Sequence, residues 1–533
     1  MQRISALLLV LVLGSYAMYY AIPEDVSNVS CDNCNLVIIT LDSVRLDHMA
    51  LYGYERSTTP NIDNFGQGAL VFTNYFSTSY LTPVSAFSML TGRYPFSNGV
   101  VSFYSYLRDD VTSLAETLQA EGYRAAAFGS SPEYELFPSL KESGMRGFDV
   151  YKTFTSDDPD ILPSRSQVPV EEAIAWAEDS SQPFFLWMPI GAAHWPYDPF
   201  EERTFTDAGY DGFLRNLPSG FKTYSQIYKG TYYPIREGTM PNVRQSLHLP
   251  EYSSRHTEEV DLLLEWGPSA TTSLNAEDLE YVRGRYDDGL LFMDRIVGDI
   301  IATLEEKHLD RDTIIIIESV HGEELGERGV IGHYDIDEAT IRSPLMIKVP
   351  GARSRRIDAL ISGVDIYPTA LSMLGIDMAM RDGIDFVPFL SGVTSTEPRQ
   401  EVFLTRTPLF ETLYTVEGDS MTSARYERLR SEDARMHYHD SAIRTNEWKL
   451  IHRTSRVALS RYSWWQYLTG NIENIPEYEL YFLLDDPLET TNLYNERPDI
   501  ATPLQERLSA WENTQASDRN LLKMQDTIRQ EYF

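Results

Sequence analysis

Short, almost continuous apolar runs alternate along the chain with longer stretches of helical periodicity. The runs are rich in β-branched residues, which is typical of strands buried on both faces. They lie at Asn35–Leu41, Arg124–Phe128, Phe184–Ile190, Ile314–Ile317 and Leu345–Val349. Strands that alternate with helices predict an α/β fold with a mostly parallel central sheet and helices on both faces. Ligand sites in such sheets lie at the carboxyl ends of the strands.

Two stretches between these runs have helical spacing. In Ala276–Glu306, apolar residues recur every three or four positions, which predicts a long helix with one buried face. Val364–Leu374 is a second candidate helix.

The alternation is interrupted once and ends before the C-terminus. Residues 200–275 are rich in Tyr, Gly, Pro and charge, and are interpreted as an inserted loop region. We therefore expect a main domain at 35–392 and a smaller α+β C-terminal subdomain at 393–533. Its expected strands and helix are Glu401–Thr405, Ser441–Arg444, Trp448–His452 and Ile500–Trp511.

The first 22 residues contain an apolar run from Ile4 to Ile22 behind one positive charge. This pattern is typical of an export signal, and the run is also long enough to span a bilayer uncleaved. A cleaved signal peptide and a retained N-terminal anchor both remain open. Either predicts an exported protein that is periplasmic, extracellular or held at the membrane by this segment alone.

The net charge of the chain excludes some classes of binding partner. The chain of 533 residues has 79 acidic and 45 basic residues, a formal net charge of -34. Such a surface repels nucleic acid, which excludes it as a partner. It also repels anionic substrates at long range, so a site for one is expected to be locally positive.

Cys31 and Cys34 are the two cysteines. They are too few for a zinc site of four thiolates. A redox dithiol would stand at a helix N-terminus after a strand, whereas this pair precedes the first strand. In an exported protein, a local structural disulfide is favoured.

Asp42 ends the first predicted strand, where a carboxylate can bind a divalent cation or cap a helix. The sequence continues through Ala50–Gly53 and Thr58–Asp63, and together these segments resemble the sulfatase-like branch of the alkaline phosphatase superfamily. Many members have two adjacent aspartates there, whereas Asp42 is followed by Ser43. The resemblance implies a divalent metal ion (Ca, Mg, Mn or Zn) with Asp42 as a ligand.

Ser79–Pro95 resembles the nucleophile motif of sulfatases, which carries a cysteine that is oxidised to formylglycine. Counting back from Leu-Thr-Gly at residues 90–92 places Thr82 at the nucleophile position and as a metal ligand. Without a cysteine, formylglycine chemistry through Cys is excluded. A threonine at this position resembles the phosphoethanolamine and glycerol-phosphate transferases. The alternative is that Thr82 caps a helix at Ser85–Leu90.

Two histidines match family positions that contact the reacting group. His194 opens a His-x-Pro-Tyr sequence after the strand Phe184–Ile190, and His333 ends a Gly-His pair. Imidazole suits proton transfer because its pKa lies near neutrality. Both residues could instead be ordinary loop or surface histidines.

Val320 stands where the family has an aspartate ligand. Residues 319–322 read Ser-Val-His-Gly, whereas the family turn reads Ser-Asp-His-Gly. His321 is retained and is expected to ligate the metal. Glu318 and Glu323 are the two carboxylates close enough in sequence to substitute for the missing one.

The resemblance extends from about Asn35 to Leu493, where the segment from Glu479 matches a C-terminal sulfatase signature. It implies a hydrolase of a sulfate, phosphate or phosphonate ester, with an anionic substrate such as a sulfated glycan. The substitutions at positions 82 and 320 leave two alternatives. One is an impaired or inactive homologue that binds an anionic glycan or another partner, and the other is a transferase of the phosphoethanolamine or glycerol-phosphate type.

Overall fold

The structure is a computed structural model of the whole chain. It describes residues 29–102, 105–130, 142–153, 168–179, 181–194, 197, 203–212, 275–327, 331–333, 335–377, 381–406, 440–454 and 476–532, with side chains described as far as Gln515. The N-terminal apolar segment and most of the insertion expected at 200–275 lie outside these ranges. Among the described residues, no helix is long and apolar enough to cross a membrane.

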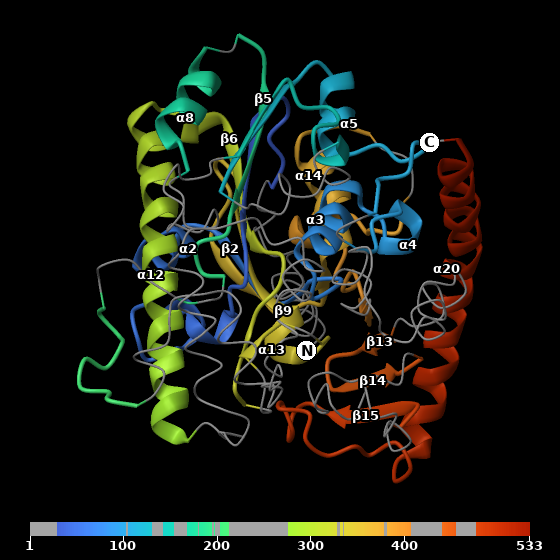
Figure 1. Cartoon of the computed structure of the whole chain (residues 1–533). Helices are drawn as coiled ribbons and strands as arrows, with labels where there is room; N and C mark the ends of the chain where they lie inside the picture. Colours follow the sequence, from blue (N-terminus) through green and yellow to red (C-terminus); the bar gives the residue numbers. More distant parts are fainter. Residues whose placement is uncertain are drawn as a thin grey trace, which may run out of the picture.

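A central sheet of nine strands forms the middle layer (Figure 1). Its strand order is β10-β2-β9-β6-β1-β5-β3-β4, with β11 paired to β2. All pairings are parallel except those of β9, which runs antiparallel to β2 and β6. The strands are β1 (Asn35–Leu41), β2 (Leu70–Phe76), β3 (Arg124–Gly129), β4 (Val150–Thr153), β5 (Phe184–Ile190), β6 (Thr313–Ser319), β9 (Arg342–Lys348), β10 (Arg355–Ile357) and β11 (Ile361–Ser362). The predicted α/β class and mostly parallel sheet are confirmed.

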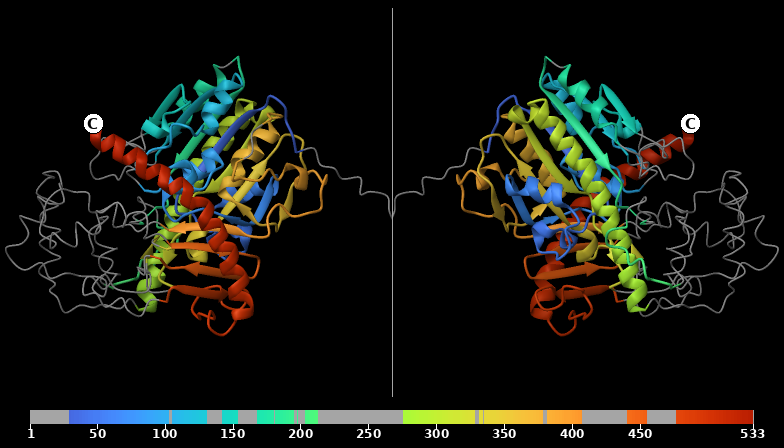
Figure 2. Two further views of the ribbon diagram at one scale, coloured as in Figure 1. Left: turned by 90° about the vertical axis from the view of Figure 1, so that its right-hand side faces the viewer. Right: turned by 90° about the vertical axis from the view of Figure 1, so that its left-hand side faces the viewer.

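Helices cover both faces of this sheet (Figures 1 and 2). Strand alternation creates two cores, since Ile314 and Ile316 of β6 belong to one apolar cluster while Ile315 and Ile317 belong to the other. The first cluster includes residues of α3 (Thr82–Thr91), α5 (Leu114–Ala120), α14 (Ile366–Met373) and α15 (Val387–Leu390). The second includes residues of α2 (Pro60–Gln67), α8 (Val170–Glu178) and α12 (Ala276–Glu306).

α12 is the long helix that the apolar periodicity predicts. It starts at a capping box in which Asn275 and Asp278 each accept a backbone N–H of the other. Farther along, its Asp294 accepts hydrogen bonds from the backbone N–H groups of Asn61 and Ile62, at the start of α2. This carboxylate satisfies N–H groups that have no partner within α2 itself.

A second sheet of four antiparallel strands follows the main domain, in the order β12-β13-β14-β15. Its elements are β12 (Val402–Arg406), β13 (Asp440–Arg444), β14 (Trp448–His452), β15 (Tyr478–Phe482) and the helix α20 (Pro498–Tyr532). α20 runs along this sheet and beside α4 (Pro95–Asn98) (Figure 2). Trp511 of α20 stacks on Phe403, with ring centroids 4.9 Å apart, and meets Tyr94 edge-on.

Five charged side chains with no exposed surface lie between the two sheets. Arg453 donates to Asp335 (2.6 Å), Asp440 (3.2 Å) and Glu479 (3.1 Å). Arg406 donates to the same Asp440 (2.8 Å). Buried charges of opposite sign that pair in this way fix the position of the second sheet relative to the first.

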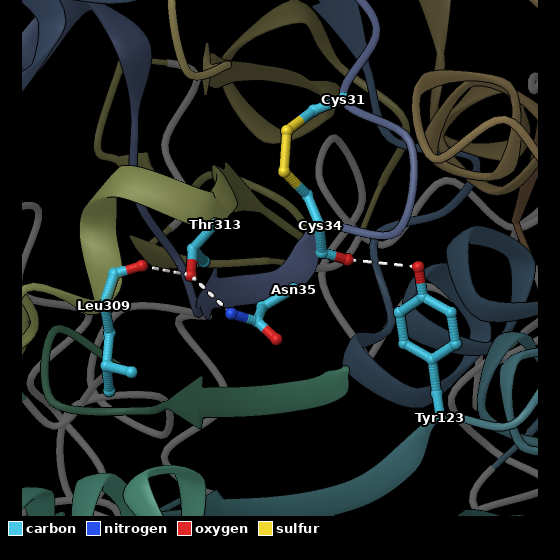
Figure 3. The surroundings of a disulfide bond; sticks show 6 residues. All are labelled: Cys31, Cys34, Asn35, Tyr123, Leu309 and Thr313. Carbon is cyan, nitrogen blue, oxygen red and sulfur yellow. Dashed lines mark hydrogen bonds between the residues drawn. A yellow bond between two sulfur atoms is a disulfide. The ribbon is translucent and has the colours of Figure 1, made fainter. Parts of the chain in front are cut away.

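Cys31 and Cys34 form a disulfide directly before β1 (Figure 3). The hydroxyl of Tyr123 donates to the carbonyl of Cys34 (3.0 Å), and Asn35 donates to the Thr313 hydroxyl (3.3 Å). The expected structural disulfide is therefore present, and it stands at the amino end of the sheet, away from the carboxyl ends where the site is expected.

The sequence predicts strands and helices well where they are buried on both sides. β1, β5, β14 and α12 have the predicted bounds, and the other predicted strands differ at one or both ends by one to three residues. β2 was not predicted, nor were the short strands β4, β10 and β11. β2 reads Leu-Val-Phe-Thr-Asn-Tyr-Phe, so polar residues interrupt the apolar run.

Candidate active site

Asp42, Thr82 and His321 meet at the carboxyl end of the central sheet. Asp42 follows β1, Thr82 opens α3, and His321 follows β6. The Thr82 hydroxyl oxygen lies 3.0 Å from Nε2 of His321, and 3.3 and 3.4 Å from the two Asp42 oxygens. Nε2 of His321 is 3.2 Å from Oδ1 of Asp42. All three side chains are buried.

The backbone around Asp42 is held firmly. Asp42 N–H donates to the carbonyl of Ile190 on the neighbouring strand (3.0 Å). The next residue, Ser43, has φ of 62°, a conformation that costs a non-glycine residue free energy. The Tyr286 hydroxyl from α12 stabilises it by donating to the Ser43 carbonyl (2.7 Å) and accepting from the Arg45 N–H (2.8 Å).

Thr82 is the first residue of α3, and the N-cap position is Leu81, without a side-chain cap. The alternative that Thr82 caps the helix is therefore wrong, and the helix begins three residues earlier than expected. The Thr82 hydroxyl instead faces Asp42 and His321. Because helix N-termini carry partial positive charge, this end of α3 favours an anionic group beside Thr82.

His321 lies in a tightly packed turn. Gly322 N–H donates to the carbonyl of Thr340 (2.6 Å), and a Cβ on Gly322 would lie 2.2 Å from the carbonyl oxygen of Ala339. Nδ1 of His321 is 2.9 Å from the carbonyl oxygen of Gly322. Because a carbonyl only accepts, Nδ1 carries a proton, and Nε2 is the ring nitrogen that faces Thr82 and Asp42.

His194 and His333 lie beside this group as a pair. Their Nε2 atoms are 3.0 Å apart, and the His333 ring lies 4.2 Å from that of His321 between centroids. Nδ1 of His333 is 2.9 Å from the carbonyl oxygen of Tyr80 and so carries a proton. Nε2 of a neutral His333 is then an acceptor, so Nε2 of His194 holds the proton between the two rings.

Val320 is buried in the apolar core, and its side chain offers no ligand. Of the two carboxylates considered as substitutes, Glu318 lies within β6, where Tyr75 donates to it (3.3 Å). Glu323 is fully buried, and both of its carboxyl oxygens lack a hydrogen bond of ordinary geometry from the described residues. The hydroxyls of Ser43 and Tyr197 nevertheless lie close enough to Glu323 to lower its pKa.

Burial dominates the electrostatics of these acids. It raises the pKa of Asp42, against the effect of His194, which lowers it. It raises the pKa of Glu323 to about 8 and that of Glu318 to about 7. The basic group that acts most strongly on both Asp42 and Glu323 is the same, His194.

The spacing of Asp42, Thr82 and His321 fits ligands of a small cation. For metal–ligand bonds of about 2.1 Å, two ligand atoms lie about 3.0 Å apart at a right angle and about 3.4 Å apart at a tetrahedral angle. The distances among the three side chains span 3.0 to 3.4 Å. Nε2 of His321 lies 3.2 Å from Oδ1 of Asp42. An unprotonated Nε2 and this oxygen would repel each other through their lone pairs unless a proton or a cation lies between them.

This donor set is small. Across the described part of the chain, no three His, Cys, Asp or Glu side chains come together in an arrangement that holds a metal ion. Asp42 and His321 therefore depend on the Thr82 hydroxyl as a third ligand atom. The residues fit a cation, but Ser43 and Val320 stand at two positions where many family members have a carboxylate.

The structure thus brings together all five residues that the sequence singled out. Sequence reasoning missed the supporting residue Tyr286, and it gave Tyr197 no role beyond its place in the His-x-Pro-Tyr motif. Tyr286 lies on the buried face of α12, and Tyr197 follows His194 by three residues with φ of 37°. The Tyr286 hydroxyl reaches the loop after β1 from α12, a contact that no local sequence pattern indicates.

Comparison with known proteins identifies the family. The sulfatase family model matches residues 34–376. Iduronate 2-sulfatase from Homo sapiens is 24% identical over 544 residues, covering 89% of this chain and 93% of that protein. An ulvan-active sulfatase from Formosa agariphila is 25% identical over 377 residues, covering 66% of this chain and 63% of that protein.

Solved structures agree on the fold. A phosphonate monoester hydrolase of Agrobacterium radiobacter superposes with a TM-score of 0.64 at 21% identity, covering 90% of this chain and 96% of that one. A protein solved with its substrate D-glucosamine-2-N,6-O-disulfate gives a TM-score of 0.63 at 18% identity, covering 91% and 99%. With the family model matching more than half of its length, this chain belongs to the sulfatase family.

Proposed function

We propose that this protein hydrolyses a sulfate ester, with Thr82 as the nucleophile and a divalent cation held by Asp42, Thr82 and His321. Its relatives in the family are sulfuric ester hydrolases, and the family typically uses a divalent metal. The observation that carries the proposal is the contact of the Thr82 hydroxyl with both His321 (3.0 Å) and Asp42 (3.3 Å), at the N-terminus of α3.

Each residue has a defined part in this chemistry. A cation bound at the site supplies positive charge that lowers the pKa of the Thr82 hydroxyl and offsets charge on the ester oxygens. The Thr82 hydroxyl passes its proton to the Asp42 carboxylate and its oxygen attacks sulfur, while the bond from sulfur to the alcohol oxygen breaks. The proton that His194 and His333 hold between their Nε2 atoms passes to the departing alcohol. Water then cleaves the threonine sulfate ester: Asp42 returns its proton to the Thr82 oxygen, one proton of the water returns to the histidine pair, and sulfate is released.

We propose a sulfated glycan as the substrate class. Two relatives support this choice: the Formosa agariphila protein is described as active on ulvan, and another structure of the same fold contains a disulfated glucosamine. The net charge of -34 repels a polyanion at long range, so binding should be strongest at high ionic strength. The helix N-terminus at Thr82 and the histidine pair favour the sulfate group locally.

The test is turnover of an aryl sulfate and of sulfated oligosaccharides, with phosphate mono- and diesters in parallel, in the presence of Mn²⁺ or Ca²⁺. We expect preference for sulfate, a loss of at least 100-fold in kcat in Thr82→Ala, and a smaller loss in Thr82→Ser, which keeps the hydroxyl. Unchanged turnover in Thr82→Ala would remove Thr82 from the mechanism.

Val320 supports a second candidate, a binding protein without catalysis, because an apolar core residue replaces a ligand. That candidate predicts no turnover of any ester by the wild type, together with measurable binding of a sulfated oligosaccharide. The transferase alternative predicts transfer to an alcohol acceptor from a phosphodiester rather than sulfate release. Val320→Asp adds a carboxylate at the position, and under our proposal it raises cation affinity.

A further inference from the structure

The turn after β6 contains a carboxylate without a described partner. Glu323 is fully buried, and neither of its oxygens accepts a hydrogen bond of ordinary geometry from any residue that the structure describes. A buried carboxylate without a partner is costly, and native proteins retain such groups chiefly where something else binds them. Glu323 is therefore a candidate ligand.

Glu323 lies on the cation side of this turn. The Ser43 hydroxyl is 3.4 Å from Oδ1 of Asp42, and the same hydroxyl lies close to the Glu323 carboxyl. The carboxylates of Asp42 and Glu323 also repel each other, and the negative charge of Asp42 raises the pKa of Glu323. The Ser43 hydroxyl thus lies near both carboxyl groups.

The backbone holds Glu323 in this place. Arg45 Nη1 donates to the Glu323 carbonyl (3.2 Å) and to the carboxylate of Glu327 (2.5 Å). Gly322, one residue earlier, is held by Thr340 as described above. A carboxylate on a turn fixed at both ends does not need to be ordered when a cation binds, which lowers the cost of binding.

The balance of charge at the site also supports Glu323 as a ligand. Asp42 and Glu323 are two buried acids, and His194 lowers the pKa of both. A divalent cation would neutralise the pair, whereas Asp42 alone would leave such a cation with excess positive charge. His321 and Thr82 add neutral ligand atoms on the Asp42 side.

We infer that Glu323 supplies the negative charge that Val320 lacks, binding the cation through one water molecule rather than directly. This rests on the proposed cation site of Asp42, Thr82 and His321. It assigns the second acidic ligand to the turn after β6 rather than to the end of the strand.

The experiment is calorimetric titration of the metal-stripped full-length protein with Mn²⁺ alone, with thermal unfolding measured with Mn²⁺ and with chelator. Glu323→Gln keeps the shape of the side chain and should weaken Mn²⁺ binding at least tenfold. In chelator the same variant should unfold at a higher temperature than the wild type, because a neutral amide replaces a buried carboxyl group without a described partner. A purely structural role for Glu323 predicts a lower temperature instead.

Glu318→Gln is the matched control, since Glu318 is equally buried and also acts on Asp42, but is bonded by Tyr75. We expect its Mn²⁺ affinity to stay within threefold of the wild type. An equal loss in both variants would show a long-range charge effect and overturn the assignment of Glu323 as a ligand. Val320→Asp in the Glu323→Gln background should restore most of the lost affinity.

The variant Asp42→Asn distinguishes a failure of the proposed cation site from a failure of the assignment of Glu323 as a ligand. If Asp42→Asn abolishes Mn²⁺ binding while Glu323→Gln binds like the wild type, the inference about Glu323 is wrong and the proposed cation site stands. If Asp42→Asn also binds like the wild type, or if the wild type binds no Mn²⁺, the proposed cation site itself is wrong.

Discussion

Glu318 shows how a single buried acid in the sheet couples stability to pH. It stands in register with Thr40 of β1, and the Tyr75 hydroxyl donates to it (3.3 Å). Burial raises its pKa from 4.5 to about 7. A carboxyl whose pKa is higher in the folded state favours folding below its unfolded pKa, and this contribution is lost as pH rises through the folded value.

We therefore expect the wild type to lose about 3 kcal/mol of unfolding free energy through Glu318 as pH rises from about 4.5 to about 8. Glu318→Gln does not ionise, so its stability relative to the wild type should rise by that amount over the same interval. Urea unfolding in chelator at pH 5 and pH 8 measures the difference. Parallel pH profiles for the two proteins would contradict the assignment.

At the residue scale, sequence identified the five residues that meet at the end of the sheet but not the residues that support them. Thr82 and His321 were found because short motifs fix their spacing from glycines and from a strand end. Glu323 was considered only for its closeness in sequence to Val320. That it is buried without a described partner depends on Ser43 and α12, which come from distant parts of the chain.

Among the elements, α12 carries the support for the loop beside the site. Its Asp288 accepts hydrogen bonds from the backbone N–H groups of Thr204 (2.8 Å), Phe205 (2.8 Å) and Thr206 (3.1 Å). Gly284, one turn earlier, allows close approach, because a Cβ there would lie 2.6 Å from the Phe205 carbonyl oxygen. The described part of the insertion is thus attached to α12 by Asp288 and, through the Tyr210 hydroxyl, by Asp278.

Asp288→Ala should release residues 203–206 and destabilise the protein by about 2 kcal/mol or more, because three buried or half-buried N–H groups lose a charged acceptor. The matched control is Asp299→Ala on the exposed side of the same helix, which should change stability by less than about 0.5 kcal/mol. Thermal unfolding and protease cleavage near residue 205 measure both effects. Equal behaviour of the two variants would contradict this role.

Element prediction succeeded where one local signal dominates. β1, β5 and β6 are apolar throughout because both faces are covered by helices, and such runs are unmistakable. β2 was missed because Thr73 and Asn74 interrupt its apolar pattern at a register shift against β9. The order of the strands in the sheet is not readable from any of them.

In the whole molecule, the ion network between the two sheets is the feature with the largest expected effect on stability. Arg453 pairs with three buried carboxylates, Asp440 and Glu479 of the second sheet and Asp335 of the main domain. Removing one partner leaves the others charged and buried, which costs about 3–5 kcal/mol.

Arg453→Met should therefore lower the unfolding free energy by about 3–5 kcal/mol and loosen the C-terminal sheet. Arg507→Met is the control, since Arg507 pairs with Glu401 at the surface and should cost less than about 1 kcal/mol. Urea unfolding gives the energies, and hydrogen exchange in β13 and β14 reports the loosening. A small effect of Arg453→Met would show that apolar packing alone holds the sheets together.

Net charge is also a property of the whole molecule. At -34 the folded chain repels itself, and salt screens this repulsion. We expect the melting temperature to rise as NaCl increases from about 0.01 to about 1 M, measured in chelator so that cation binding does not contribute. A falling melting temperature would mean that screened ion pairs outweigh the net repulsion.

The sequence by itself determined the α/β class, the family and which five residues are candidates for the site. Apolar runs and short motifs are local patterns, so they can be recognised in the sequence alone. Only the tertiary structure decided that Thr82 starts its helix and faces Asp42, that the histidines pair through Nε2, and that Glu323 is buried beside Ser43. These depend on how β1, α3, β6 and α12 pack against one another. Packing is a sum of many weak contacts between distant residues, and no single segment of the chain encodes it.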